Sequence, residues 1–421
     1  MVRLYQLLTA FIEPMLPLWL FLRRLRGKEE PGRIRERYGV AGLPRPKGTL
    51  LWLHAASVGE ANSVLLLIEK LRARFPQLQM LLTTGTVTSA ALMKTRLPKG
   101  VIHQYVPLDT PDFTRRFIRH WKPDIAFWVE SEFWPNLVLN ARAYNCFMTV
   151  INARMSPRSF AMWQKYPALI TAMLHCFDYI FAQSEEDGER LKKLGAKKII
   201  CEGNIKYDAA LLPCDESELL RLKQIIGSRP VWLAASTQPG EEKMAAKAHN
   251  LLSAMRPQLL CIIVPRHPGR GEQIAAQLGT NFRVALRSRK DPITPQTQIY
   301  IADTLGELGL FYRLSGIVFM GGSLVKHGGQ NPLEPARLSC AIVTGSHTEN
   351  FLQIYQEMDA LGAVLRATNA ESLAAQMDSL LNQSVTATTL QTLARQWVDT
   401  KTGTADRIIN QLAPIFSVGA S

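Results

Sequence analysis

The sequence lacks the cysteine and histidine patterns that hold a disulfide framework or a metal ion. Its six cysteines are scattered, with no C-x-x-C pair, and most of them lie in apolar runs. Its eight histidines show no H-E-x-x-H motif or other ligand spacing. Isolated thiols in apolar runs are typical of buried cysteines in a reducing compartment. We therefore expect neither disulfides nor a structural metal.

Internal repeats, low-complexity segments and basic stretches interleaved with aromatic residues are also missing. The chain has 421 residues, of which 47% are hydrophobic and 20% charged, so it is globular and long enough for two α/β domains. Lys and Arg number 49 against 35 Asp and Glu, which gives a net charge of +14. This excess predicts an anionic partner, namely nucleic acid, a phospholipid surface or a phosphorylated substrate. The absence of aromatic-interleaved basic repeats disfavours nucleic acid.

The N-terminus has an apolar run that is too interrupted for a simple transmembrane helix. Residues 4–22, LYQLLTAFIEPMLPLWLFL, are mostly large and apolar but include Glu13, Pro14 and Pro17. A membrane span needs about 20 apolar residues, and a carboxylate at mid-depth is costly. We expect residues 1–26 to form a membrane-anchor segment that lies in one leaflet. A buried N-terminal helix is the alternative interpretation.

Seven basic residues follow the apolar run directly. They are Arg23, Arg24, Arg26, Lys28, Arg33, Arg35 and Arg37. A polybasic cluster next to an apolar segment is typical of proteins that bind anionic headgroups. The charge lies on the wrong side of the run for a secretory signal, and no small-residue cleavage site follows it. The positive-inside bias predicts that the remaining chain stays in the cytoplasm.

Short apolar runs alternate with helical periodicity from residue 49 onward. The runs lie at residues 49–55, 79–84, 124–130, 147–153 and 178–183, and again at 231–236, 259–266, 297–303, 316–320 and 341–345. Because these runs show no polar alternation, they predict strands that are buried on both faces of parallel sheets. The predicted fold is α/β, with two doubly wound, Rossmann-like domains that face a ligand cleft.

The predicted domains follow from where this rhythm stops and restarts. The first covers residues 27–208 and the second 209–421, with a plausible linker near residues 208–217. The helical stretch at 390–412 looks able to cross back onto the first domain. A ligand is expected where the carboxyl ends of the strands meet.

The stretch GGSLVKHGGQNPLE, from Gly321 to Glu334, is the strongest functional signal. Its glycines follow a buried strand, so backbone N–H groups there can face an anion. Asn331 and Pro332 predict a helix start, where a phosphate is favoured, and Glu334 can accept hydrogen bonds from ribose hydroxyls. We interpret the stretch as a nucleotide monophosphate site. A tight strand-to-helix turn with a capped helix is the alternative.

Other strand ends of the second half carry polar groups that are expected to meet at the same place. The candidates are Ser236, Thr237, Arg266, Thr304, Gly306, Glu307, Gly322 and Ser323. Arg266 is the best phosphate ligand among them, because a planar guanidinium binds two oxygens at once. The loop with Thr304 and Glu307 is predicted to edge the nucleobase or a phosphate. Convergence of several strand ends supports a nucleotide site more than any single motif does.

The first half offers carboxylates and cations at its own strand ends. Glu60 follows the first strand and is placed to act as a general base, although a carboxylate in a first helical turn also complements the helix dipole. Glu130 ends another strand and can tune that base through like charge. Its alternative role is helix capping, which Glu132 fits better. Arg154 and Lys206 suit phosphate or carboxylate groups, or are surface charges in a basic chain.

These motifs together resemble the 3-deoxy-D-manno-oct-2-ulosonic acid (Kdo) transferases of lipopolysaccharide assembly. The motifs occur in the same order and spacing in that family, over nearly the whole chain. They are HAASVGE, WVESEFWPNL, NARMS, GNIKYD, PRHP, DTLGEL, GGSLVKHGGQNPLEP and GSHTENF. The sequence departs from the family at Ala55 or Ala56, where a serine is usual. It departs again in NIKYD, which replaces an SLKFD-like segment. Neither departure removes a charged group.

The resemblance implies a metal-independent GT-B glycosyltransferase without cofactors. It implies that CMP-Kdo binds to the second half and the lipid A precursor (lipid IVA) to the first half, at the cytoplasmic face of the inner membrane. It also implies that Glu60 is the catalytic base and that Glu130 is a second essential acidic residue. Inversion at the anomeric carbon needs only one base, and no D-x-D cluster is present. The rival interpretations are another GT-B sugar-nucleotide enzyme, such as a UDP-sugar transferase or epimerase, and a basic nucleic-acid-binding protein.

Overall fold

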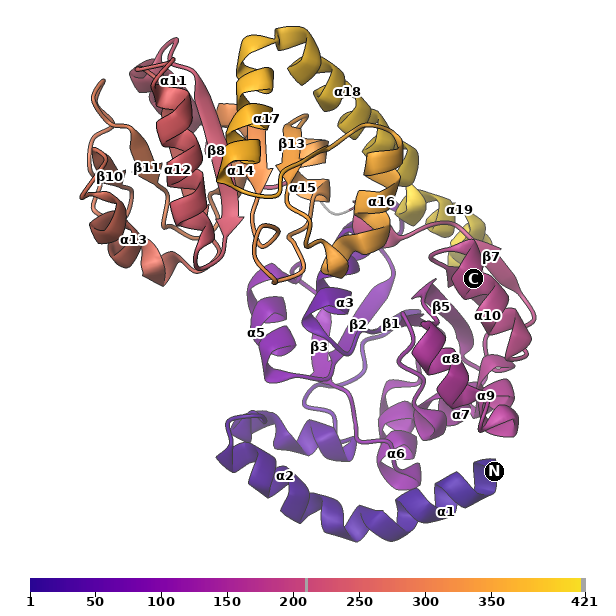
Figure 1. Ribbon diagram of the computed structural model, residues 1–421. Coiled ribbons are helices and arrows are strands. Elements are labelled where there is room, and N and C mark those ends of the chain that lie inside the picture. Colours follow the sequence, from indigo (N-terminus) through magenta and orange to yellow (C-terminus); the bar gives the residue numbers. More distant parts are fainter. Residues whose placement is uncertain (209–210, 418–421) are drawn as a thin grey trace. The chain divides into compact units, whose positions relative to one another are not determined.

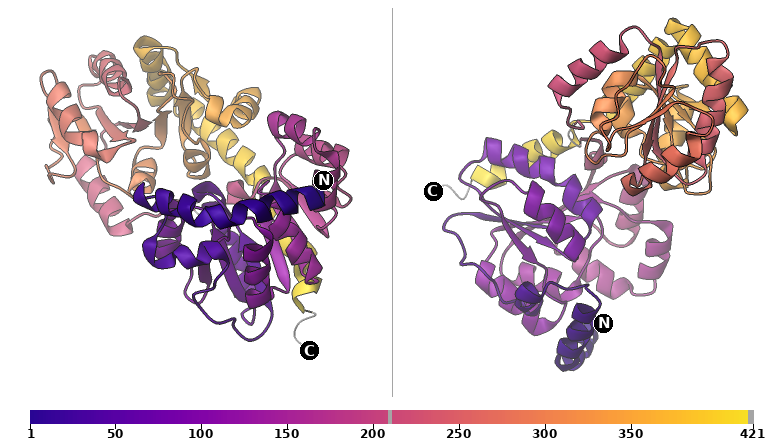
Figure 2. Two further views of the ribbon diagram at one scale, coloured as in Figure 1. Left: turned by 90° about the horizontal axis from the view of Figure 1, so that it is seen from below. Right: turned by 90° about the vertical axis from the view of Figure 1, so that its left-hand side faces the viewer.

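The computed structural model describes residues 1–208 and 211–417. The chain forms two compact units, one made of Met1–Ala209 with Lys401–Ser421 and the other of Ala210–Thr400. Each unit contains one seven-stranded sheet in which all strand pairs are parallel, with helices on both faces (Figures 1 and 2). The predicted α/β fold with two doubly wound sheets is confirmed.

The sheet of the first unit reverses its strand order between β1 and β4. Its order is β3-β2-β1-β4-β5-β6-β7. The strands are β1 (Leu50–His54), β2 (Gln79–Thr84), β3 (Ile102–Tyr105), β4 (Ile125–Val129), β5 (Phe147–Ala153), β6 (Tyr179–Ala182) and β7 (Ile199–Cys201). In a doubly wound sheet, this reversal leaves a crevice at the carboxyl ends of the two strands. Residues that follow β1 and β4 therefore lie at the expected ligand position.

Helices cover both faces of this sheet. One face packs against α6 (Pro111–Trp121), α7 (Pro135–Ala143), α8 (Pro157–Trp163), α9 (Pro167–Leu174) and α10 (Glu185–Lys193). The other packs against α3 (Val58–Ser63), α4 (Leu65–Arg74), α5 (Val87–Arg96) and α19 (Thr404–Ser417). Trp52 and Trp128 lie side by side in the first of these cores, with ring centroids 4.7 Å apart.

The last helix belongs to the first unit. The helix predicted over 390–412 is in fact two helices, α18 (Ser384–Lys401) and α19, because Gly403 adopts a positive φ of 83° between them. Asp208 accepts hydrogen bonds from the backbone N–H groups of Gly403 (2.6 Å) and Ala405 (2.5 Å). Phe416 packs against Phe75 with ring centroids 4.9 Å apart. The segment from Lys401 onward thus lies outside the unit that holds the rest of residues 209–421.

The sheet of the second unit has the order β10-β11-β9-β8-β12-β13-β14 and reverses between β8 and β12. Its strands are β8 (Val231–Thr237), β9 (Leu260–Pro265), β10 (Val284–Leu286), β11 (Ile299–Ile301), β12 (Ile317–Met320), β13 (Ala341–Thr344) and β14 (Leu365–Arg366). One face packs against α12 (Glu241–Ser253), α13 (Gly271–Leu278), α17 (Ala370–Asn382) and α18. The remaining helices are α11 (Glu216–Ile226), α14 (Leu308–Ser315), α15 (Leu333–Arg337) and α16 (Leu352–Ala360).

The N-terminal segment lies on the first unit with most of its apolar side chains exposed. It consists of α1 (Val2–Ile12), a 3-10 turn η1 (Glu13–Met15) and α2 (Leu16–Leu25), and it bends at the turn (Figure 1). Val2–Leu25 is long and apolar enough to cross a membrane by length and composition, and 6% of its most apolar stretch is buried. The alternative of a buried N-terminal helix is therefore wrong.

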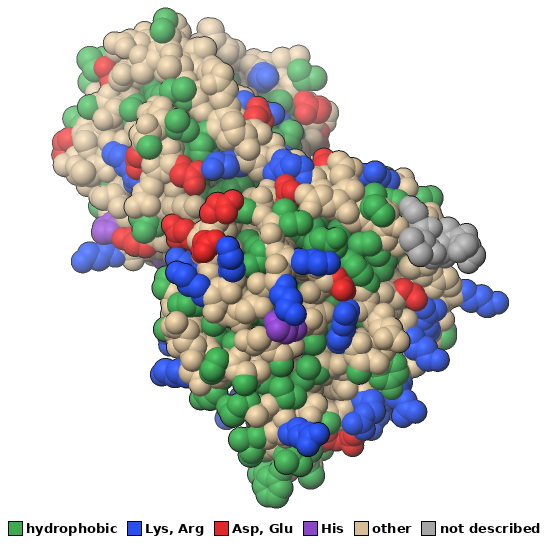
Figure 3. Space-filling view, turned by 90° about the vertical axis from the view of Figure 1, so that its right-hand side faces the viewer, with side chains coloured by type: hydrophobic (Ala, Val, Ile, Leu, Met, Phe, Trp, Pro, Cys, Tyr) green, Lys and Arg blue, Asp and Glu red, His purple; other side chains and the backbone are tan. Residues whose placement is uncertain are grey.

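Polar contacts attach α1 to the first unit. The Tyr5 hydroxyl donates to Asp109 (2.9 Å), and the Asn136 side-chain amide donates to the Thr9 hydroxyl (3.0 Å). Phe11 and Leu7 on the same helix are 81% and 69% exposed. In Figure 3, apolar side chains gather at the lower end of the view, where α1 lies in Figure 1, with Lys and Arg side chains beside them.

Three residues of the basic cluster form ion pairs within the fold. Arg37 in the 3-10 helix η2 (Pro31–Tyr38) is 5% exposed and pairs with the buried Glu29 (3.0 Å), which also binds Arg23 (2.7 Å). Arg33 likewise forms an ion pair within the fold, with Glu36. The exposed members are Arg24, Arg26, Lys28 and Arg35.

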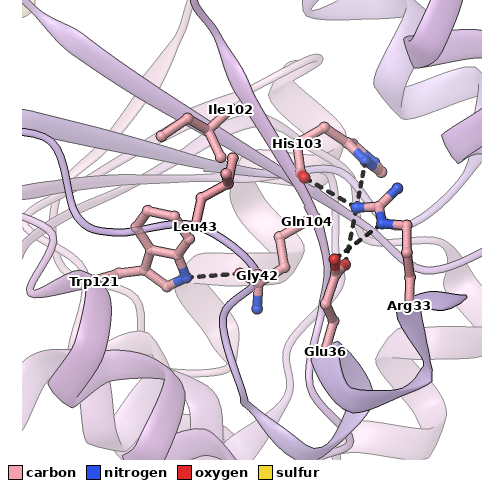
Figure 4. Close-up of a pocket in the computed structure, with 8 residues that line it drawn as sticks. All are labelled: Arg33, Glu36, Gly42, Leu43, Ile102, His103, Gln104 and Trp121. Atoms are coloured by element: carbon pink, nitrogen blue, oxygen red, sulfur yellow. Dashed lines mark hydrogen bonds and ion pairs between the residues drawn. The ribbon is translucent and has the colours of Figure 1, made fainter.

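Arg33 attaches η2 to the edge strand β3, beside a small cavity of about 200 Å³ (Figure 4). Its guanidinium donates to both oxygens of Glu36 (2.9 and 2.8 Å) and to the His103 carbonyl (2.9 Å). Burial and the neighbouring Arg33 lower the pKa of His103 to about 4. His103 is therefore neutral at physiological pH, and the segment after α2 is fixed to the sheet.

Candidate functional site

Glu60 lies in the first turn of α3, directly after β1. Its two carboxylate oxygens accept hydrogen bonds from the Ser57 hydroxyl (2.7 Å) and the Ala56 backbone N–H (2.8 Å). The Ser57 hydroxyl in turn caps the helix by accepting the Glu60 N–H (3.3 Å). The residue is only 6% exposed. The carboxylate is thus held in one orientation at the switch point of the first sheet.

The surroundings of Glu60 make it a stronger proton acceptor than an ordinary glutamate. Burial raises the pKa of Glu60 above its usual 4.5, and the negative charges of Glu132 and Glu130 raise it further. The hydrogen bonds from Ser57 and Ala56 oppose this shift. Because a general base works best when its pKa approaches the working pH, this environment suits proton abstraction.

Glu130 and Lys206 come together at the same switch point. Glu130 follows β4 and adopts a left-handed conformation (φ 59°), which costs about 1–3 kcal/mol for a residue other than glycine. Its carboxylate forms an ion pair with Lys206, in the 3-10 helix η3 (Ile205–Asp208). The side chains are 15% and 41% exposed, so the lysine ammonium remains accessible.

Asn152 is a contributor to this site that the sequence analysis did not single out. It lies in β5 with a φ of 57°, it is fully buried, and its side-chain oxygen accepts the Ile205 N–H (3.1 Å). This bond fixes the start of η3 and therefore the position of Lys206. The only sequence signal is that asparagine tolerates positive φ better than most residues. Arg154, which was predicted, is exposed and makes no side-chain hydrogen bond or ion pair with the described residues.

The Gly-rich turn after β12 does not present its N–H groups to solvent. Gly322, Ser323 and Leu324 donate to the carboxylate of Glu241 at 2.6, 3.0 and 2.9 Å. The prediction that the Gly322 and Ser323 amides bind a phosphate is therefore wrong for this structure, because an internal carboxylate already occupies the turn. The Ser323 hydroxyl is likewise used, since it donates to Met320 and accepts the Gly345 N–H (2.7 Å).

Two more predicted side-chain contacts are satisfied inside the protein. The Thr237 hydroxyl is fully buried and donates to Glu242 (3.0 Å), so it is not free for a ligand. Ser236, one residue earlier, adopts a positive φ of 56°, which redirects the chain after β8. No hydrogen bond from the Ser236 hydroxyl to the described residues is present, so Ser236 stays a predicted ligand contact.

The loop after β11 is organised around an ion pair. Glu307 pairs with Arg287, which lowers the pKa of that carboxyl, and the Thr304 hydroxyl donates to the same carboxylate. The prediction that the Thr304 and Glu307 side chains contact the nucleotide is not supported by this pairing. Gly306 lies between them with a positive φ of 84° and an exposed backbone, and it stays the predicted contact of this loop.

Arg266 and Glu334 remain available in the second unit. Arg266 follows β9, is exposed, and makes no side-chain hydrogen bond or ion pair with residues 1–208 and 211–417. Burial raises the pKa of Glu334, and the charge of Arg266 opposes that shift, so the two lie within electrostatic reach. No described residue donates to the Glu334 carboxylate. Asn331 accepts the Leu333 N–H (3.1 Å) and fixes the start of α15.

No group of three or more His, Cys, Asp or Glu side chains that can hold a metal ion occurs within the described parts of the chain. All six cysteines, which fall in those parts, are free thiols.

Two doubly wound parallel sheets, each with polar residues at its switch point, define the GT-B fold class. The structure of a putative UDP-N-acetylglucosamine 2-epimerase from Listeria monocytogenes shares this fold, with a TM-score of 0.58. It is 14% identical in sequence, and the match covers 88% of this chain and 97% of that chain.

Sequence comparison defines the family. A family model described as 3-deoxy-D-manno-octulosonic-acid transferase (kdotransferase) matches residues 32–209. A probable mitochondrial 3-deoxy-D-manno-octulosonic acid transferase of Arabidopsis thaliana is 38% identical, over 85% of this chain and 82% of the relative. A 3-deoxy-D-manno-octulosonic acid transferase of Haemophilus influenzae is 34% identical, over 97% of each chain. The chain belongs to the 3-deoxy-D-manno-octulosonic acid transferase family, and it is therefore a glycosyltransferase.

Proposed function

We propose that this protein transfers Kdo from CMP-Kdo to a sugar hydroxyl of a lipid A precursor in lipopolysaccharide assembly. Membership of the family supports the class of reaction. The observation that carries the proposal is the site after β1 and β4, where a buried, oriented Glu60 lies near the Glu130–Lys206 ion pair. The first unit would bind the acceptor and the second the nucleotide sugar.

In the proposed reaction, Glu60 takes the proton of the acceptor hydroxyl as its oxygen attacks the anomeric carbon of Kdo. The bond from that carbon to the CMP phosphate oxygen breaks, CMP leaves from the opposite face, and the configuration inverts. Lys206, which pairs with Glu130, is expected to contact an anionic group of the acceptor. Arg266 is expected to bind the phosphate and Glu334 the ribose hydroxyls, with Gly306 and Asn331 beside them.

We also infer that the N-terminal segment holds the enzyme at the cytoplasmic face of the inner membrane. The exposed apolar side of α1 and α2 supports insertion into one leaflet. The exposed cations Arg24, Arg26, Lys28 and Arg35 follow it, and they suit anionic headgroups and a phosphorylated acceptor.

The decisive experiment is incubation with CMP-Kdo and a tetra-acylated lipid A precursor, followed by product mass measurement. Glu60→Ala should lower the rate of transfer by about 10²–10⁴-fold, the range for losing a general base, with the fold retained. Glu69→Ala, at an exposed position on α4, is the matched control and should transfer normally. Undiminished transfer by Glu60→Ala would exclude Glu60 as the base. Transfer from UDP sugars in place of CMP-Kdo would overturn the donor assignment.

A further inference from the structure

A buried carboxylate fills the anion-binding turn of the second unit. Glu241, the first residue of α12, is fully buried. One carboxylate oxygen accepts the N–H groups of Ser323 (3.0 Å) and Leu324 (2.9 Å), and the other accepts those of Gly322 (2.6 Å) and Gln238 (2.9 Å). Four backbone N–H groups from the ends of β8 and β12 thus converge on one side chain.

Backbone segments pack closely around the turn that Glu241 fills. A Cβ atom on Gly321 would lie 2.6 Å from the Ser236 carbonyl oxygen, and one on Gly345 would lie 2.0 Å from the Ser323 carbonyl oxygen. The backbones after β8, β12 and β13 are therefore in direct contact around the turn. A concave set of N–H groups attracts an anion, and here the anion is part of the chain.

The turn is connected to the part of the loop that is still free to bind a nucleotide. The Gly329 N–H donates to the Gly322 carbonyl (2.8 Å), two residues before Asn331. The Asn350 side chain donates to the His327 carbonyl (2.9 Å) and holds the loop from its other side. The position of Gly322 therefore determines the positions of Asn331 and Glu334.

We infer that Glu241 is a positioning residue for the donor site. Its carboxylate holds the Gly322–Leu324 turn in the absence of ligand, and through that turn it places Asn331 and Glu334. The inference rests on the proposed function only for the identity of the nucleotide. The hydrogen-bonded turn itself is a property of the chain.

Hydrogen exchange in the wild-type protein tests this assignment without any substitution. Peptides that cover residues 322–324 should be protected from exchange without nucleotide, and CMP should change their protection little. If their N–H groups exchange freely in the absence of CMP and become protected only when it binds, then they serve the ligand and Glu241 is not their partner.

The substitution E241Q tests the effect on binding. A glutamine amide would point N–H donors at backbone N–H groups, so the turn should loosen. The Kd for CMP and the KM for the donor should then rise about tenfold. The kcat should stay within about twofold of the wild-type value, and the KM for the acceptor should not change. The matched control is E216Q, because Glu216 is the first residue of α11, is exposed, and makes no side-chain hydrogen bond or ion pair with residues 321–334. A donor KM in E241Q within about twofold of the control value would overturn the inference.

The two proposals fail in distinguishable ways. If the wild-type protein neither binds CMP nor transfers Kdo, the proposed function fails, while the exchange of residues 322–324 still shows whether Glu241 holds the turn. If E241Q does not fold, the wild-type exchange experiment decides alone. E241D, which keeps the charge but shortens the side chain by one methylene, should restore binding only in part.

Discussion

Glu60 experiences two opposing influences on its pKa that separate substitutions can resolve. Burial and the charges of Glu132 and Glu130 favour the protonated form, whereas hydrogen bonds from Ser57 and Ala56 favour the carboxylate. The net effect is a raised pKa, so Glu60 keeps its proton to a higher pH than an exposed glutamate does. Because a base acts only when deprotonated, activity should be lost as the pH falls through that raised pKa.

The acid limb of the kcat/KM profile should therefore move in opposite directions in two variants. Glu132→Gln removes a like charge and should shift the limb to lower pH, because the Glu60 carboxylate is then easier to form. Ser57→Ala removes a hydrogen bond to the carboxylate and should shift the limb to higher pH. The measurement is kcat/KM against pH for both variants and wild type. Shifts of the same sign would show that another group controls the limb.

Several residues of the site could be predicted from the sequence because they lie just after buried strands or in the first turn of the helix that follows one. Glu60, Glu130 and Arg266 lie where a parallel sheet puts its carboxyl ends, and the structure places them there. The occupant of the Gly-rich turn could not be predicted. Gly322 binds a carboxylate 81 positions away in the sequence, and this contact exists only because β8 and β12 are neighbours in the sheet. A local motif predicts an anion but not which anion.

Among the elements, interior strands could be predicted and edge strands could not. The four strands that the sequence analysis missed are β3, β7, β10 and β14, which are the four edges of the two sheets. An edge strand is short and partly faces solvent, so it lacks the continuous apolar run of a strand buried on both faces. In β3, for example, His103 and Gln104 interrupt the apolar run. The His103 carbonyl accepts a hydrogen bond from Arg33, and the Gln104 side chain accepts one from the Trp121 indole N–H. Their partners come from other elements, so the local sequence alone does not reveal them.

The element η2 offers a direct test of the buried ion pair that fixes it. Arg37→Ala would leave the carboxylate of Glu29, 2% exposed, paired only with the less buried Arg23, and should lower the free energy of unfolding by about 1–3 kcal/mol. Arg35→Ala, in the same 3-10 helix at an exposed position, should change it by no more than about 0.5 kcal/mol. Denaturant unfolding measures both. Equal values for the two variants would show that the pair contributes nothing to stability.

Arg37 also connects this element to the proposed base. Its guanidinium donates to the Gly85 carbonyl, and the Gly85 N–H donates to the Ala56 carbonyl (2.9 Å). The Ala56 N–H in turn holds Glu60 (2.8 Å). A Cβ atom on Gly85 would lie 2.9 Å from the Ala56 carbonyl oxygen, so this approach requires glycine. Gly85→Ala should therefore lower kcat by displacing the turn that carries Glu60. Gly32→Ala should not alter kcat, because no atom lies within 4 Å of a Cβ at that position and its φ is not positive.

For the molecule as a whole, the chain combines two sheets of similar topology with an amphipathic segment that only the first unit carries. The polar side of α1 binds Asp109 and Asn136, and this leaves the apolar side without a partner in the described part of the chain. An exposed apolar face of this extent on a folded domain marks a membrane or protein contact. The exposed basic residues that follow, and the membrane-bound acceptor of the proposed reaction, favour an anionic lipid surface.

Vesicle binding tests this role with charges placed on the apolar face. Leu7 and Phe11 are one helical turn apart on α1, so Leu7→Glu with Phe11→Glu puts two carboxylates on the side that would enter the leaflet. The pair should abolish flotation with vesicles of phosphatidylethanolamine and phosphatidylglycerol, since each apolar side chain lost and each charge gained opposes insertion. Val385→Glu, at a position 77% exposed on α18, is the control and should float as wild type does.

Transfer of Kdo to an acceptor embedded in vesicles should fall in the double variant as vesicle binding falls. Transfer to a detergent-dispersed acceptor should persist, because Glu60 is unchanged. If the double variant floats normally, the segment does not hold the enzyme at the membrane.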